Sequence, residues 1–130
     1  EHLARLKLAD LFLDTYPCNA HTTASDSLRS CLPIITLRGN SFASRVTSSL
    51  LSSVGLAKLI TDTKQEYEEL AIKIATENDY FAKIKNELKN NIKTMPLLNT
   101  RMFTKNLEKA YFNVYEKYIN NNIPETFEIN

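Results

Sequence analysis

Glycine is scarce in this sequence, with only Gly39 and Gly55 among its 130 residues. A glycine-rich loop that wraps phosphates with backbone N–H groups needs several glycines close together, so that class of nucleotide site is excluded. Tryptophan is absent, and Cys18 and Cys31 are the only cysteines. Two cysteines cannot form the disulfide framework of a small secreted protein, and their surroundings match no zinc spacing. We therefore expect no metal site and two reduced thiols in a cytoplasmic protein.

The chain also lacks an excess of one charge, with 16 basic and 15 acidic residues and a net charge of +1. No basic face stands out, which argues against nucleic acid or an anionic membrane as a partner. The longest apolar runs fall far short of the ~20 residues that a membrane span needs, and no signal peptide opens the sequence. The length is that of one domain with a single core. Because the sequence begins at Glu1 rather than at methionine, we expect it to be part of a longer protein.

The first half of the sequence alternates short apolar segments with helical ones. Helices are predicted at His2–Ala9, Ser25–Cys31 and Phe42–Ser53, and strands at Leu11–Asp14, Pro33–Leu37 and Leu56–Ile60. Leu11–Asp14 and Pro33–Leu37 have the composition of strands buried on both faces, and the third strand has that of an edge. Since parallel strands need crossover connections, this order predicts a parallel α/β sheet of about three strands. We expect part of a Rossmann-like domain, with further strands upstream.

The second half is helical. Thr63 and Glu66 have the spacing of a capping box that opens a helix to about Asn78. Asp79 is the expected cap of a second helix, which Pro96 ends. A final helix is predicted to start at Asn99 or Thr100 and to reach about Asn121, followed by a frayed tail. Its apolar residues recur every three or four positions and predict a stripe that packs on the core: Phe103, Leu107, Tyr111, Val114, Tyr115 and Tyr118.

The polar stretch Cys18–Leu28 follows the first predicted strand and is the candidate site. Ligands of open α/β sheets bind beyond the carboxyl ends of the strands. Thr22 and Thr23 lie where the next helix begins, so their hydroxyls and the free backbone N–H groups can bind phosphate oxygens, and His21 can add a donor. The alternative is that Thr23 and Asp26 form a capping pair without a ligand, beside a purely structural His21. No set of residues marks a general base.

The amino-acid sequence of this region resembles the donor-binding segment of the O-GlcNAc transferases. That family follows the approximate pattern LAD-x-x-LDT-x-x-x-N-x-HTT-x-x-D, then a proline-led strand, then G-x-x-x-ASRV. The matching anchors are Leu8-Ala-Asp10, Leu13-Asp-Thr15, Asn19, His21-Thr-Thr23, Asp26, Pro33, Gly39 and Ala43-Ser-Arg-Val46. Gln65-Glu-Tyr67 and Leu98-Asn-Thr100 also look like family positions. The resemblance covers nearly the whole chain.

The resemblance implies an inverting glycosyltransferase of two Rossmann-like domains with the active site between them. Such enzymes move N-acetylglucosamine from UDP-GlcNAc to Ser or Thr hydroxyls of intracellular proteins, with no metal or other cofactor. This chain would be the C-terminal part of the donor-binding domain, with residues 1–62 as the α/β part that binds the nucleotide sugar and residues 63–130 as its helical part. An upstream catalytic domain and tetratricopeptide repeats would complete the protein, and the fragment alone would be inactive.

Carried over by position, His21, Thr22 and Thr23 would hold the donor diphosphate, and Asp26 would accept hydrogen bonds from the ribose hydroxyls. In the family, a histidine and an arginine three residues later contact the nucleobase. Only His2 and Arg5 offer that pair here, on one face of a short helix. Without the resemblance these two would be ordinary surface residues.

The sequence departs from the family pattern in two places, directly after His-Thr-Thr and just before the strand predicted at Pro33–Leu37. The glycine after His-Thr-Thr is Ala24, and Trp-Ala-Gly-Thr-Pro becomes Arg29-Ser-Cys-Leu-Pro33. We expect these changes to alter packing at Cys31 and Leu32 and to leave the donor contacts intact. Two alternatives stay open: a non-catalytic nucleotide-binding or protein-interaction module, or a relative of the SPINDLY type that uses GDP-fucose.

Overall fold

The computed structural model describes residues 1–129. These residues form two compact units, the first from Glu1 to Leu97 and the second from Leu98 onward. The first unit contains a small sheet and most of the helices, and it carries every predicted site residue. Over the described residues, no helix is both long enough and apolar enough to cross a membrane.

The sheet of the first unit has three parallel strands in the order β1-β2-β3. The strands are β1 at Phe12–Leu13, β2 at Ile34–Leu37 and β3 at Ile60–Thr61. Phe12 pairs with Ile34 on one side of β2, and Thr36 pairs with Ile60 on the other. The prediction of about three parallel strands joined by helices is therefore confirmed, with β2 as the central strand.

The expectation that the first strand is buried on both faces is wrong. Within the described residues β1 lies at an edge of the sheet, and Leu13 is 53% exposed. All four residues of β2 are buried, as predicted for a central strand. The third strand is shorter than expected because Ala57–Leu59 form a turn of 3-10 helix before β3 begins. An apolar run of a few residues cannot by itself reveal whether other elements will cover both faces of the strand.

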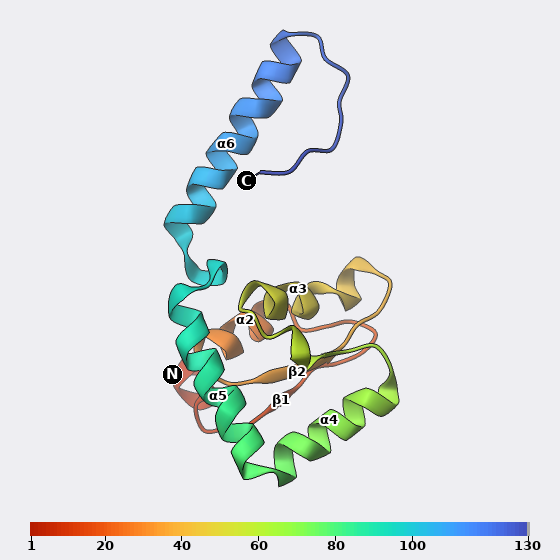
Figure 1. Ribbon diagram of the computed structural model, residues 1–130, viewed down its shortest axis with the longest axis vertical. Coiled ribbons are helices and arrows are strands. Elements are labelled where there is room, and N and C mark those ends of the chain that lie inside the picture. Colours follow the sequence, from red (N-terminus) through yellow and green to blue (C-terminus); the bar gives the residue numbers. More distant parts are fainter. Residues whose placement is uncertain (130) are drawn as a thin grey trace. The chain divides into compact units, whose positions relative to one another are not determined.

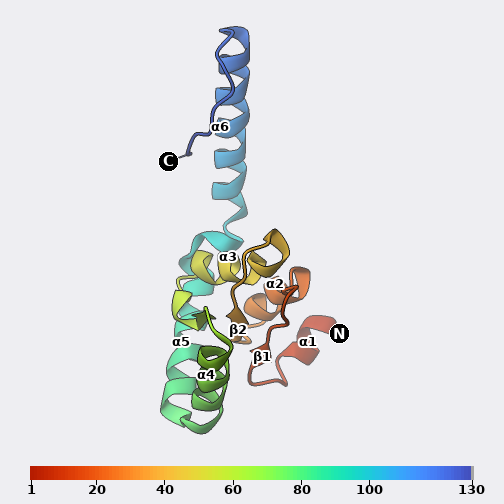
Figure 2. The same cartoon turned by 90° about the vertical axis from the view of Figure 1, so that its right-hand side faces the viewer.

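Helices cover both faces of this sheet. In Figures 1 and 2, α2 at Thr22–Arg29 and α3 at Val46–Ser53 lie on one side of the strands, and α4 at Lys64–Thr76 lies on the other. The short α1 at His2–Leu6 packs against α2, and α5 at Asn78–Thr94 packs against α4 and α2. Fully buried side chains from the strands and helices form the core: Leu28, Ile34, Ile35, Leu51, Val54, Leu59, Ile84 and Leu88.

Local signals set several helix boundaries. Thr63 and Glu66 form the predicted capping box, with the Glu66 N–H donating to Thr63 Oγ1 at 3.1 Å. The helix expected from Phe42 is instead a 3-10 turn at Phe42–Ser44 followed by α3. The cap of α5 is Glu77 rather than the predicted Asp79, and no side chain caps that helix end. Such shifts of one or two residues are ordinary at helix ends.

The second unit consists mainly of α6 at Thr100–Ile119, whose start is capped by the Asn99 side chain, which accepts from the Met102 N–H at 3.0 Å. Within the second unit α6 has no buried residue, and packing of its apolar stripe on the core stays a prediction. Tyr111 is 67% exposed and Tyr118 is 78% exposed. The periodicity correctly identified the stripe, but a stripe is buried only where another element lies against it.

Candidate functional site

The N-terminus of α2 is the centre of the candidate site. His21 is the residue before the helix, and Thr22 and Thr23 are its first two residues; all three side chains are exposed. The first helical hydrogen bond runs from the Ser25 N–H to the His21 carbonyl at 3.1 Å, so the N–H groups before Ser25 have no partner within the helix. These donors lie just after β1, at the carboxyl end of the parallel sheet, where such folds bind ligands.

The alternative of a capping pair at Thr23 and Asp26 is wrong for this structure. No side chain caps α2, and Thr23 is already inside the helix rather than before it. The Asp26 carboxylate instead lies 3.1 Å from Nε2 of His2. The hydroxyls and N–H groups at the start of α2 are therefore not used up by a local cap.

The contact between His2 and Asp26 joins two groups of predicted site residues that are 24 positions apart in the sequence. His2 is the first residue of α1, and Arg5 is exposed one turn later on the same helix. Because α1 packs against α2, the predicted nucleobase residues lie on the element next to the predicted diphosphate residues. The pair is partly exposed, with side-chain exposures of 48% for His2 and 28% for Asp26, so solvent weakens its attraction.

His21 has an aromatic neighbour. Its ring lies edge-on to the ring of Phe42, with 6.0 Å between the ring centres and an angle of 89° between the planes. Phe42 is 81% exposed, so both rings border the open surface beside the start of α2.

A buried carboxylate beneath the site was missed by sequence reasoning. Asp14 follows β1 directly, is only 6% exposed, and accepts hydrogen bonds from the loop that leads to His21. Tyr67 Oη donates to the Asp14 carbonyl oxygen at 2.9 Å. Burial, followed by the negative charge of Asp14, raises the pKa of Tyr67 above its usual value. An aspartate at the end of a strand was the available signal, but the sequence does not reveal which way such a side chain points.

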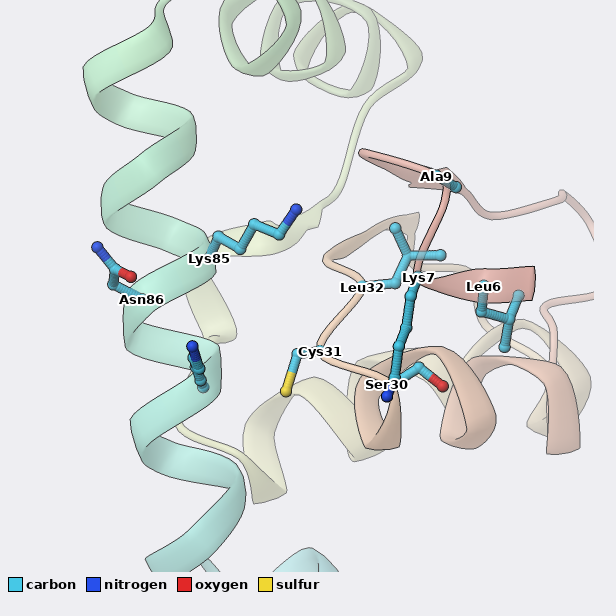
Figure 3. Close-up of a pocket in the computed structure, with 9 residues that line it drawn as sticks. Leu6, Lys7, Ala9, Ser30, Cys31, Leu32, Lys85 and Asn86 are labelled. Atoms are coloured by element: carbon cyan, nitrogen blue, oxygen red, sulfur yellow. The ribbon is translucent and has the colours of Figure 1, made fainter. Parts of the chain in front are cut away.

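A hollow lies at the other end of α2, and none of the six predicted site residues lines it. It has a volume of about 250 Å³ and is bordered by α1, the turn after α2, and α5. In Figure 3, Lys85 extends from α5 toward Leu32 and Ala9, while Asn86 points away. Cys31, on the turn, has a left-handed backbone with φ of 59°. Glycine is the residue that adopts this conformation freely, and glycine is what the resemblance places there.

The described residues hold no group of three or more His, Cys, Asp or Glu side chains that could bind a metal ion. The predicted site residues offer N–H groups, hydroxyls, two histidines, the Asp26 carboxylate and the Arg5 guanidinium.

The fold is that of an α/β glycosyltransferase catalytic region. A solved structure of a Thermobaculum terrenum O-GlcNAc transferase mutant superimposes with a TM-score of 0.78 at 33% sequence identity, over 85% of this chain and 21% of that one. The model of glycosyl transferase family 41 matches residues 1–107. The chain belongs to this family, which confirms the resemblance and the fold class inferred from the sequence.

Relatives from plants and animals agree with this assignment. The chain is 37% identical over 130 residues to an Arabidopsis thaliana protein named as a probable UDP-N-acetylglucosamine–peptide N-acetylglucosaminyltransferase SEC, and the match covers 99% of this chain and 13% of the relative. A Caenorhabditis elegans UDP-N-acetylglucosamine–peptide N-acetylglucosaminyltransferase is 32% identical over 118 residues, 91% of this chain and 10% of that protein. The chain thus spans a small part of the length of these relatives.

Proposed function

We propose that this chain forms the diphosphate-binding part of the donor site in a protein O-glycosyltransferase. The donor would be UDP-GlcNAc, and the acceptors would be Ser or Thr hydroxyls of intracellular proteins. One observation carries the proposal: α2 begins at Thr22 with no capping side chain, at the carboxyl edge of a parallel sheet. Family membership adds the class of reaction.

Each predicted residue has a role that fits its position. His21, Thr22 and Thr23 would donate hydrogen bonds to the diphosphate, together with the free N–H groups and the positive end of the α2 dipole. During transfer, negative charge builds up on the departing UDP, and fixed donors at this position stabilise that charge. The contribution is electrostatic, and the proposal assigns no proton transfer to these residues.

The nucleoside would lie over α1. Asp26 would accept from the ribose hydroxyls, and His2 and Arg5 would contact the base. The contact of Asp26 with His2 supports this arrangement, because it holds a ribose acceptor next to a base-binding ring. A GDP-sugar would use the same diphosphate and ribose groups, so the two donors differ in this proposal only at the base.

The proposal is tested by titrating UDP, and then GDP, into the isotope-labelled chain while backbone amide shifts are followed by NMR. We expect UDP to shift the amides of residues 21–26 and those of His2 and Arg5. The variant His21→Ala should lose most of the response. Thr22→Ala should weaken binding, whereas Thr100→Ala, at the same position of α6, should not. Spectra that stay unchanged up to millimolar UDP would overturn the proposal.

A second candidate role is protein interaction through α6. The observation in its favour is the apolar stripe of α6, of which Tyr111, Tyr115 and Tyr118 are all more than half exposed. We propose that the upstream part of the longer polypeptide covers this stripe. In a binding measurement with that part expressed separately, Tyr115→Glu should weaken association. Asn106→Glu, which adds the same charge at an exposed polar residue of the same helix, should weaken it less.

A further inference from the structure

We infer that Asp14 is a positioning residue for the diphosphate site: its buried carboxylate holds the loop that sets the start of α2. The inference rests on the proposed function, since it concerns how the diphosphate donors are placed. Asp14 follows β1 directly and is only 6% exposed, so its carboxylate is buried rather than on the surface.

The carboxylate closes the loop after β1 at both ends. Oδ1 of Asp14 accepts from the N–H of Thr15 at 2.9 Å and from the N–H of Ala20 at 2.7 Å. Oδ2 accepts from Oγ1 of Thr36, on the neighbouring strand β2, at 2.6 Å. One side chain therefore ties the first and last residues of the loop to each other and to the central strand.

Ala20 is held on its other side as well. Its carbonyl oxygen accepts from Oγ1 of Thr47 on α3 at 2.8 Å. The preceding residue, Asn19, is tied to the 3-10 turn before α3 by a hydrogen bond from its N–H to the Ala43 carbonyl at 2.8 Å. Since His21 follows Ala20 directly, these bonds leave little freedom to the position and direction of the first N–H groups of α2.

A carboxylate accepts all three of these hydrogen bonds. Both loop-end partners on Oδ1 are N–H donors, and Thr36 is used as a third donor, so the side chain acts as an acceptor throughout. An asparagine has the same shape but offers an NH₂ group that cannot accept. A nearly buried charge is costly unless its hydrogen bonds are made, which is the reason for its tight partnering here. Fixing donors before the ligand arrives is what strengthens binding of a charged group.

The test compares UDP with UMP, which lacks the second phosphate, in the wild type, Asp14→Asn and His21→Ala. Dissociation constants are obtained from NMR shifts. If Asp14 positions the diphosphate donors, Asp14→Asn should weaken the binding of UDP by about tenfold and the binding of UMP much less. The ratio of the UMP dissociation constant to the UDP dissociation constant should therefore fall. Thermal unfolding and far-UV circular dichroism report separately on the fold. A merely structural role would lower stability and weaken both nucleotides alike.

Two further variants sharpen the result. Asp62→Asn changes an exposed carboxylate at the end of β3, which is paired with Arg38, and should leave the ratio unchanged. Thr36→Val removes the donor to Oδ2 and should lower the ratio in part, whereas Thr36→Ser, which keeps the hydroxyl, should restore it. These milder changes keep the inference testable if Asp14→Asn does not fold.

The outcomes separate the two proposals. If the wild type shows no preference for UDP over UMP, the proposed diphosphate role fails and the inference fails with it. If His21→Ala lowers the ratio while Asp14→Asn and Thr36→Val leave it unchanged, the diphosphate site stands and the positioning role of Asp14 is overturned.

Discussion

The two units of this chain treat polar and apolar side chains in opposite ways. In the first unit, polar residues such as Asp14, Thr36 and Thr47 are buried and hydrogen-bonded. In the second, aromatic residues such as Tyr111 and Tyr118 are exposed along α6. The difference shows that burial depends on the neighbours that the fold supplies. A polar group is stable inside when its partners are in place, and an apolar stripe is buried only where another element lies against it.

The same contrast separates the stability of the units. The first has a core in which strands and helices from distant positions meet. A single helix gains little stability in water from its own hydrogen bonds, so α6 depends on whatever packs against its stripe.

The largest expected effect is on the core. Leu28→Ala removes a fully buried side chain from α2 and should destabilise the first unit by about 3 kcal/mol. The matched change Leu107→Ala, at a leucine of α6 that is 39% exposed, should cost less than about 1 kcal/mol. Urea unfolding followed by far-UV circular dichroism measures both. Equal losses would break the comparison, because they would mean that the α6 stripe is buried in solution.

Gly39→Ala should be the next most damaging change. An added Cβ would lie 2.4 Å from Oγ of Ser44 and 2.7 Å from its Cβ, so the backbone must shift, at a cost of about 2 kcal/mol. Removing the Ser44 side chain in the double variant Gly39→Ala/Ser44→Gly relieves this clash and should recover part of the loss. If the double variant is no more stable in urea than the single one, close packing against Ser44 is not the reason for glycine here.

Tyr67 gives the buried polar network a pH signature. Its pKa is raised in the folded state, so the folded protein holds that proton more tightly than the unfolded chain does. The contribution to stability is complete below the unfolded pKa of about 10 and is lost as pH rises through the higher folded value. Tyr67→Phe should cost about 1 kcal/mol at neutral pH and should flatten this decline.

The matched control is Tyr111→Phe on the exposed face of α6. It should leave the stability at neutral pH unchanged. Unfolding curves collected across the alkaline range measure how the free energy of unfolding falls with pH. If it falls equally steeply in the wild type and in Tyr67→Phe, the raised pKa of Tyr67 is not the cause of the decline.

The smallest expected effect is a gain. Cys31 has φ of 59°, a conformation that costs energy for a residue with a side chain, so Cys31→Gly should stabilise the first unit by about 0.5 kcal/mol after the added flexibility of glycine is subtracted. Asn121 in the second unit has φ of 54°, but asparagine adopts this conformation more readily, so Asn121→Gly should gain less. Melting temperatures test the order, and a destabilised Cys31→Gly would mean that the cysteine side chain contributes packing.

Much of the fold could be predicted from the sequence because its signals are local. The capping box of Thr63 and Glu66 acts over one helical turn, and the alternation of apolar strands with helices indicates parallel pairing before any contact is known. The start of α2 at the polar stretch after β1 was predicted for the same reason. The roles of the six site residues stay predictions, because they concern a ligand that the fold alone does not define.

The sequence by itself determined the family, the parallel α/β order and the polar helix start that follows β1. Only the tertiary structure decided that Asp14 is buried and that His2 reaches Asp26 across 24 positions. The physical reason is distance along the chain. Capping and periodicity act within a few residues, whereas burial and long-range hydrogen bonds depend on which remote segment arrives alongside.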